Sequence, residues 1–359
     1  APPPKQPPST PATVGPGRRG HEMCALLAED RLAFPAGHCK GVAVGGYLLQ
    51  GGYGWNSRVL GPACESVIGL DVVTADGELV HASPDRHADL YWSARGSGPG
   101  FFGVVTRFHV RVYPQPTVCG SSLWVWPLDL LDDVYGWLRE IGPDVDRRVE
   151  IQALMSRSFE GLDLHEPAIV MASPVFADSE EEALAALELL GTCPVRDRAL
   201  LEVPYAPATL PEWYEAVMQE YPAGHRYATD NMWTHASFDE LRPGLHRIAE
   251  TLPPAPSHCL WLNWGPSPER QDMAYSLEDE VYLALYGMWS DPADDERYGD
   301  WARSNMDAMS PLATGIQLAD ENLGRRPARF ATDAAMDRLD RTRAEYDPDG
   351  RFHSWMGRV

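Results

Sequence analysis

A glycine-rich stretch near the start of the chain constrains the fold more than any other feature. Residues 41–55, GVAVGGYLLQGGYGW, contain two Gly-Gly pairs among valines and aromatic residues, and Gly37-His38-Cys39 comes shortly before them. Glycine adopts backbone conformations that other residues avoid, and it lets other groups approach the main chain closely. We therefore expect sharp turns or close backbone contacts here rather than one regular element.

Two interpretations of this stretch remain open on composition alone. Backbone N–H groups that no side chain covers can come close to a polyanion such as a pyrophosphate, and the valines and aromatic residues offer an apolar wall for a flat ring. The other interpretation is a glycine-rich turn region in an ordinary β-rich domain.

Length and charge restrict the partners. A chain of 359 residues can form two domains or one large one. Its formal net charge of -22 argues against nucleic acid and against an anionic membrane surface, which both attract basic proteins. No apolar run is long enough to cross a bilayer. Residues 1–20 lack the apolar middle of a signal peptide, so we expect a disordered Pro-rich tail and a cytoplasmic protein.

The six cysteines are widely scattered. None belongs to a C-x-x-C pair, and no compact Cys/His set has zinc-ligand spacing. This pattern favours individually buried, reduced thiols, and we expect no metal site.

Several elements can be predicted from local patterns. Residues 67–80 alternate as a hairpin around Asp76-Gly77. The segment from Thr332 to Tyr346 has a cap and one apolar face, as an amphipathic helix should. Gly96 to Gly100 could be mistaken for a Rossmann fingerprint, but a helix-like segment precedes it and a strand follows, which is the wrong order.

Four segments together resemble one known family. GHCKGVAVGGYLLQGGYGWNSRVLG, DVVTADGELV, DLYWSARGSGPGFFGVVTRFHVRVYP and AEYDPDGRFHSW are similar to segments of the FAD-linked oxidases of the berberine bridge enzyme type, within the vanillyl-alcohol oxidase superfamily. The resemblance implies an α+β fold. In it, an FAD-binding domain of the vanillyl-alcohol oxidase type spans 21–118 and is joined by a C-terminal segment, 326–359. A substrate-binding domain built on an antiparallel sheet is inserted over 119–325.

The resemblance also implies a set of cofactor contacts. The family's GxC motif can supply a thiol that bonds to C6 of the flavin, and the matching residue is Cys39; the alternative is an inert, buried cysteine. The flavin and its phosphates are expected against Gly37, His38, Cys39, Val42, Val44, Gly45, Gly46, Gly52, Tyr53 and Gly54, and the adenine end near Gly103, Val104 and Val105.

The sequence departs from the family pattern in two places. Residues 1–20 contain no Arg-Ser-Gly-Gly-His-Ser-like loop, so we expect the N-terminal flavin-binding lobe to be lacking, or a second chain, a missing segment or an altered loop to complete the FAD site. Where relatives commonly present a tyrosine, this chain has Gln317, which cannot take a proton. Gln317, Asp320 and Tyr227 are therefore weak candidates for the catalytic machinery.

The implied function is hydride transfer from a small organic substrate to flavin N5, with O2 as the electron acceptor. The substrate class stays open among alcohols, sugars, amines and natural-product intermediates. The alternative is a truncated, non-catalytic scaffold that binds a ligand or partner.

Overall fold

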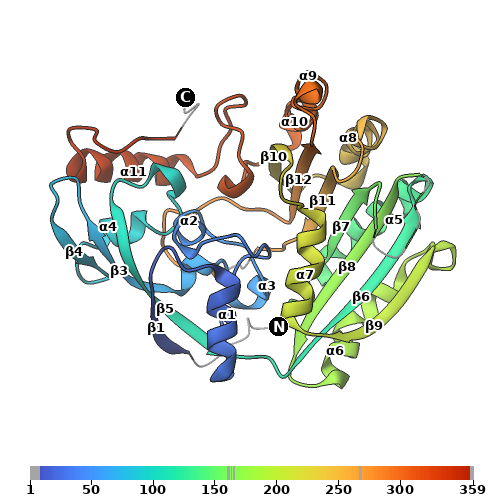
Figure 1. Cartoon of the computed structure of the whole chain (residues 1–359), viewed down its shortest axis with the longest axis horizontal. Helices are drawn as coiled ribbons and strands as arrows, with labels where there is room; N and C mark the ends of the chain where they lie inside the picture. Colours follow the sequence, from blue (N-terminus) through green and yellow to red (C-terminus); the bar gives the residue numbers. More distant parts are fainter. Residues whose placement is uncertain (1–8, 160–161, 163, 165, 267–268, 356–359) are drawn as a thin grey trace. The chain divides into compact units, whose positions relative to one another are not determined.

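The computed structural model describes residues 9–159, 162, 164, 166–266 and 269–355. These residues form two compact units (Figure 1). Unit 1 comprises the described residues of 1–116, 267–277 and 330–358, and unit 2 those of 117–266 and 278–329. Within the described residues, no helix is both long and apolar enough to span a membrane.

Unit 1 is built on an antiparallel sheet with the strand order β1-β5-β3-β4, and β2 also pairs with β5. Its strands are β1 (Thr10–Val14), β2 (Leu32–Ala33), β3 (Val67–Val73), β4 (Leu79–Ala82) and β5 (Val104–Pro114). Its helices are α1 (Gly20–Glu29), α2 (Val44–Leu49), α3 (Ser57–Leu60), α4 (Ala88–Ser93) and α11 (Asp333–Tyr346).

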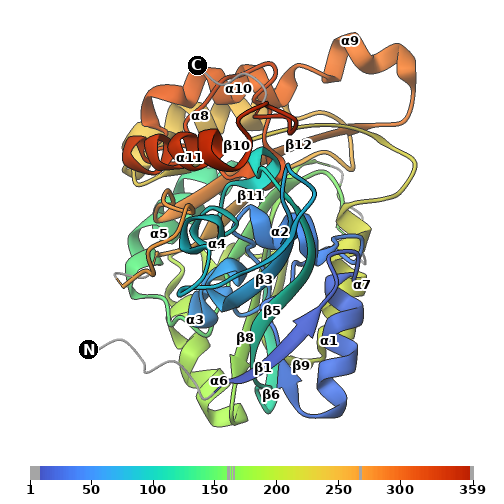
Figure 2. The ribbon, with the colours of Figure 1, turned by 90° about the vertical axis from the view of Figure 1, so that its left-hand side faces the viewer.

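The predicted hairpin and C-terminal helix are confirmed. Strands β3 and β4 pair antiparallel, and Gly77 in the turn between them has a positive φ of 81°. The side chain of Thr332 accepts a hydrogen bond from the Ala335 amide and caps α11. Helix α11 runs beside α4, and Arg338 pairs with Asp89 there at 2.7 Å (Figures 1 and 2).

The predicted tail over residues 1–20 is wrong for its second half. Strand β1 runs along β5, and Ala12 is paired with Val110 (Figure 2). Pro11 is compatible with this strand because β1 lies at the edge of the sheet. An edge strand has no partner strand on its outer side, so an amide that proline lacks is not missed there. Residues 1–8 lie outside the described residues.

The predicted boundaries of the middle segment also need correction. Residues 269–277 belong to unit 1, where the indole Nε1 of Trp92 donates to Asp272 at 2.7 Å and the Tyr275 amide donates to the Arg95 carbonyl at 2.8 Å. Residues 326–329 belong to unit 2, since the Ile316 amide donates to the Arg329 carbonyl at 2.7 Å. Local patterns could not reveal these long-range bonds.

Unit 2 is built on an antiparallel sheet in the order β10-β12-β11-β7-β8-β6-β9. The strands are β6 (Val118–Pro127), β7 (Gln152–Ser156), β8 (Ala168–Ala177), β9 (Leu201–Ala208), β10 (Arg226–Thr234), β11 (His258–Asn263) and β12 (Val281–Trp289). The helices are α5 (Leu131–Ile141), α6 (Glu180–Leu187), α7 (Leu210–Glu220), α8 (Phe238–Thr251), α9 (Asp295–Tyr298) and α10 (Trp301–Met309). The antiparallel sheet expected in this part of the chain is present.

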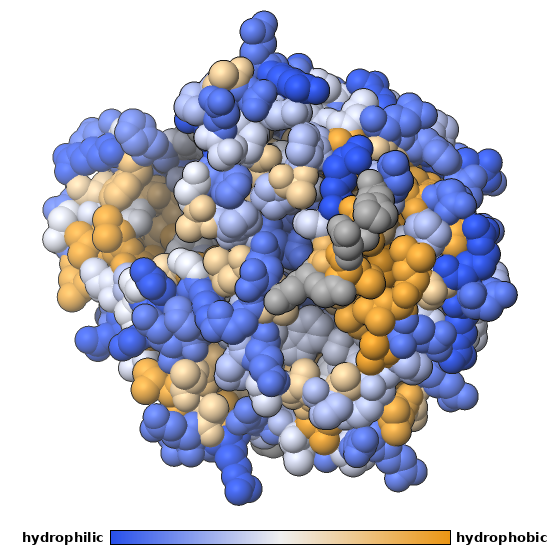
Figure 3. Space-filling model, turned by 45° about the vertical axis from the view of Figure 1, so that its right-hand side comes forward, coloured by the Kyte–Doolittle hydropathy of each residue, from blue (hydrophilic) through white to orange (hydrophobic). Residues whose placement is uncertain are grey.

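One face of this sheet is covered by helices. Helices α5, α6, α8 and α10 share a single apolar core with the strands, and on β12 this core includes Val281, Leu283 and Leu285. Because side chains alternate along a strand, Tyr282 and Tyr286 point to the opposite face. Charged and polar side chains cover most of the surface seen in Figure 3, as the net charge of -22 leads one to expect.

Candidate functional site

The glycine stretch of unit 1 contains a short helix that the sequence analysis did not anticipate. Helix α2 covers Val44–Leu49, and the chain then turns through Gly51 and Gly52, whose φ values are 109° and 84°. The predicted sharp turn is therefore confirmed at the second Gly-Gly pair. Only glycine adopts such angles without strain, which explains the pair independently of any ligand.

Most glycines of this stretch are close to the protein's own atoms. A Cβ on Gly52 would lie 2.8 Å from the ring of Tyr47, one on Gly37 would lie 3.2 Å from the same ring, and one on Gly54 would overlap the Ala36 carbonyl. Gly103 is similar, since a Cβ there would lie 2.6 Å from Val72. These glycines thus have a packing role that needs no cofactor.

The amides at the start of α2 already have partners. The Val44 amide donates to the Arg18 carbonyl and the Gly45 amide to the Pro16 carbonyl, both at 2.9 Å. These two donors do not fit the role of phosphate ligands.

The segment around Cys39 has a different character. Gly41 and Gly46 are exposed, and a Cβ at either would meet no atom within 4 Å. Cys39 itself is half-buried, and its carbonyl accepts a hydrogen bond from the Val42 amide at 3.3 Å. Unlike the packed glycines, Gly41 and Gly46 therefore leave open space beside the main chain.

The other residues of unit 1 that were predicted to contact FAD lie in the glycine stretch and on β5. The ring of His38 packs edge-on against Trp55 at 4.4 Å, and that of Tyr53 packs against Tyr275 at 5.8 Å. Val104 is exposed and Val105 is buried.

In unit 2, Asp320 is the centre of a polar cluster on the face of the sheet opposite the core that α5, α6, α8 and α10 form. The hydroxyls of Tyr282 and Tyr286 both donate to its Oδ2 atom, at 2.7 and 3.0 Å. No described residue donates a hydrogen bond to the other oxygen, Oδ1. Burial raises the pKa of Asp320, and the two tyrosine hydrogen bonds oppose that shift. The pKa of each tyrosine lies well above its ordinary value because of burial and the nearby carboxylate.

Aromatic side chains surround this carboxylate. Trp233 packs against Tyr282 with ring centroids 5.0 Å apart, and Tyr221 packs edge-on against Tyr286 at 5.1 Å. His258 is fully buried beside them, 3.3 Å from the Tyr221 hydroxyl. Sequence analysis missed these residues because positions 221, 233, 258, 282 and 286 share no local motif.

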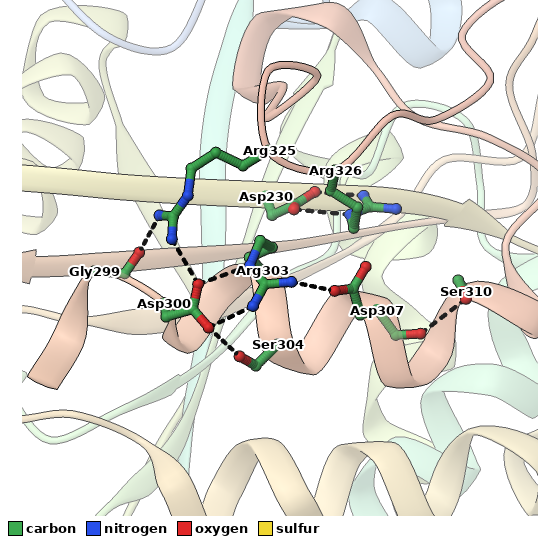
Figure 4. Close-up of polar contacts among 9 residues, drawn as sticks. All are labelled: Asp230, Gly299, Asp300, Arg303, Ser304, Asp307, Ser310, Arg325 and Arg326. Atoms are coloured by element: carbon green, nitrogen blue, oxygen red, sulfur yellow. Dashed lines mark hydrogen bonds and ion pairs between the residues drawn. The ribbon is translucent and has the colours of Figure 1, made fainter. Parts of the chain in front are cut away.

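Asn231 fixes the loop that carries Asp320. Its Nδ2 donates to the carbonyls of Gln317 and Asp320, at 3.0 and 2.8 Å, and its Oδ1 accepts from the Gln317 amide at 2.8 Å. Next to it, Asp230 forms a buried ion pair with Arg326 (Figure 4). The loop is thus held to β10 at both ends.

Gln317 and Tyr227 do not join the Asp320 carboxylate. The side-chain oxygen of Gln317 accepts from the Ala319 amide at 2.6 Å and so shapes the loop. Tyr227 is exposed, donates to the Pro222 carbonyl, and lines an open cavity of about 480 Å³. Asp320 does not line that cavity, and two arginines that do, Arg226 and Arg325, are paired with acidic residues.

Comparisons with known proteins identify the class. Residues 7–83 match a family model described as an FAD binding domain. The chain is 31% identical over 342 residues to the FAD-linked oxidoreductase nodO of Hypoxylon pulicicidum, an alignment that covers 94% of this chain and 75% of the relative. The fold is shared with the solved structure of the Physcomitrella patens protein BBE-like 1, with a TM-score of 0.82, 15% identity, and coverage of 98% of this chain and 80% of that one.

This protein is therefore an FAD-binding enzyme with the fold of the vanillyl-alcohol oxidase group. The chain belongs to the family of FAD-linked oxidoreductases, and it shares the fold of a berberine-bridge-enzyme-like protein. A shorter alignment, 43% identical over 106 residues and covering 29% of this chain and 21% of the relative, links it to the xylooligosaccharide oxidase of Thermothelomyces thermophilus.

Proposed function

We propose that this FAD-linked oxidoreductase oxidises a hydroxyl-bearing carbon of a small ring-containing substrate to a carbonyl, with Asp320 as the proton acceptor. The observation that carries the proposal is the uneven use of the Asp320 carboxylate: both tyrosines donate to Oδ2, and no described residue donates to Oδ1. The Oδ1 atom can therefore accept a hydrogen bond from a substrate hydroxyl.

In this oxidation the substrate carbon loses a hydride and its hydroxyl group loses a proton, which leaves a carbonyl group. Bound FAD would supply the hydride acceptor at N5, and O2 would take up the two electrons and two protons as hydrogen peroxide. Asp320 takes the hydroxyl proton at Oδ1. Burial raises its pKa, so Asp320 is a stronger base than an exposed aspartate.

The substrate class follows from the surroundings of Asp320. Trp233, Tyr282 and Tyr286 form a largely buried aromatic environment beside Asp320, which favours a ring-containing substrate over a small linear one. The name of the xylooligosaccharide oxidase supports a sugar substrate.

Replacement of Asp320 tests the proposal. Asp320→Asn keeps the shape but cannot accept a proton, so kcat should fall about 10²–10⁴-fold. The FAD content should not change. The assay is anaerobic bleaching of the flavin by a panel of sugars and alcohols, followed by peroxide release after oxygen is admitted. Asp279→Asn is the control, because Asp279 forms an ion pair with exposed His235. Wild-type turnover in Asp320→Asn would refute the assignment.

For the cofactor, we infer that Cys39 forms a thioether with flavin C6, a bond that would replace the S–H and C6–H bonds and send the two electrons released to O2. Support comes from the half-buried position of Cys39 in a segment whose exposed glycine, Gly41, borders open space. After acid precipitation the yellow colour should stay with wild-type protein and wash out of Cys39→Ala. The control is Cys119→Ala, which removes another half-buried cysteine. Colour that washes out of the wild type would mean that the flavin is held without a covalent bond.

A further inference from the structure

Three metal-ligating side chains meet on the sheet of unit 1, apart from the residues discussed so far. Asp71 lies on β3, His81 on β4 and His109 on β5, which are adjacent strands. Asp71 is paired directly with His81, and His109 is paired with Gly69, two residues before Asp71. Since residues two apart on a strand share a face, the three side chains lie on the same side of the sheet.

The contacts within this group are short. Nδ1 of His81 lies 2.7 Å from Oδ1 of Asp71, and Nε2 of His109 lies 3.4 Å from the same oxygen. The two imidazole centroids are 5.1 Å apart. A Cβ at Gly69 would lie 3.2 Å from Cε1 of His81, so the glycine makes room for that ring.

We propose that Asp71, His81 and His109 form a binding site for a divalent transition-metal ion of the Zn²⁺ type. Imidazole nitrogen and carboxylate oxygen are both common zinc ligands, with bonds near 2.1 Å, so that tetrahedral ligand atoms lie about 3.4 Å apart. One ligand atom from each of the three residues lies within 4.8 Å of the others, so small side-chain rotations complete the set.

Exposure of the site favours an exchangeable ion. The side chains of His81, Asp71 and His109 are 40%, 23% and 26% exposed, which leaves the fourth position open to water. Two imidazoles and one carboxylate with an open position form a set that zinc and related metals accept.

Besides the two histidines, Arg107 is the one side chain among the described residues that pairs with Asp71. Its Nη1 lies 3.9 Å from Oδ2 of Asp71, on the carboxylate oxygen that the histidines do not use, and the side chain is 60% exposed. It can therefore turn toward solvent when a cation binds.

The sequence expectation of no metal site rested on spacing. Zinc motifs are recognised by ligands close together in sequence, whereas positions 71, 81 and 109 come together only through strand pairing.

Metal binding to the intact chain tests the proposal. Equilibrium dialysis against Zn²⁺ should give one ion per wild-type chain, and affinity should fall at least about tenfold in His81→Ala and His109→Ala. His246→Ala is the matched control, because His246 lies 2.7 Å from Asp132 as an exposed His–Asp pair outside the three-ligand group. That variant should bind as the wild type does.

Cobalt separates this site from the cysteines. Co²⁺ bound by two histidines and a carboxylate should give d–d absorption without a thiolate charge-transfer band, and His109→Ala should abolish it. A thiolate band in the wild type, no bound ion, or unchanged affinity in His109→Ala would each overturn the proposal. If the alanine variants melt early, His109→Gln provides the same comparison with a side chain closer in size.

Discussion

The glycine stretch of unit 1 and the Asp320 cluster of unit 2 differ in how they relate to the sequence. The glycine stretch is continuous in sequence, and Gly37 to Gly54 can be recognised as a motif. Most of its glycines nevertheless pack against protein atoms, such as those of Tyr47, Ala36 and Pro16. The Asp320 cluster is discontinuous and has no motif, yet it presents a carboxylate oxygen to which no described residue donates a hydrogen bond. A motif can therefore identify a family through packing requirements, while the groups suited to chemistry come from scattered positions.

The largest effect on folding should come from the ion pair that anchors the Asp320 loop. Asp230 is fully buried, and Arg326 donates to it and to the Asn231 carbonyl. Arg326→Ala leaves that carboxylate without its countercharge, so the free energy of unfolding should fall by about 3–5 kcal/mol. Urea denaturation measures the change.

The neighbouring arginine provides the control. Arg325 pairs with Asp300 at 2.7 Å, but both side chains are well exposed (Figure 4). Arg325→Ala should therefore cost under about 1 kcal/mol. If the two variants lost the same stability, the buried pair would not be what anchors the loop.

A smaller effect is expected from the protonation of His258. Burial lowers the pKa of His258 to about 4, against an ordinary value of 6.5. As pH falls below 6.5 the unfolded chain takes up this proton first, so stability is lost between pH 6.5 and about 4. The loss is about 3 kcal/mol. His258→Gln should remove this part of the pH dependence.

Urea titrations of both proteins at neutral pH and near pH 4 provide the measurement. Other groups titrate in the same pH range, so the contribution of His258 is the difference between the two proteins in the change of unfolding free energy with pH. Parallel curves for wild type and His258→Gln would mean that folding does not shift the pKa of His258.

Local signals in the sequence were sufficient for some elements and not for others. The β3–β4 hairpin and the α11 helix depend on alternation, a turn and a cap, which are local, and both were predicted. Strand β1 was missed because prolines suggested a tail, although β5 supplies its partner. Asp320 was named as one weak candidate, but its two tyrosine donors lie on β12, distant in sequence. The Asp320 loop reaches them because Asn231 anchors it to β10, which pairs with β12.

The smallest expected effect is a difference in stability between substitutions at a packed glycine and at a glycine that borders open space. Gly54→Ala places a methyl group against the Ala36 carbonyl and should cost about 1–3 kcal/mol, because backbone cannot easily move aside. Gly46→Ala meets no atom within 4 Å and lies inside α2, where alanine is favoured over glycine by up to about 1 kcal/mol. Its stability should be unchanged or slightly higher.

The two substitutions should have the opposite order of effect on FAD affinity: Gly46→Ala should weaken FAD binding, and Gly54→Ala should not. If the flavin ring lies over the open side of residues 39–46, the methyl group of Gly46→Ala occupies part of its space and weakens FAD binding in a fluorescence titration. Gly54 faces protein atoms, so Gly54→Ala, studied below its melting temperature, should retain wild-type affinity. Weaker FAD binding in Gly54→Ala alone would mean that the packed glycines, rather than the open ones, border the cofactor.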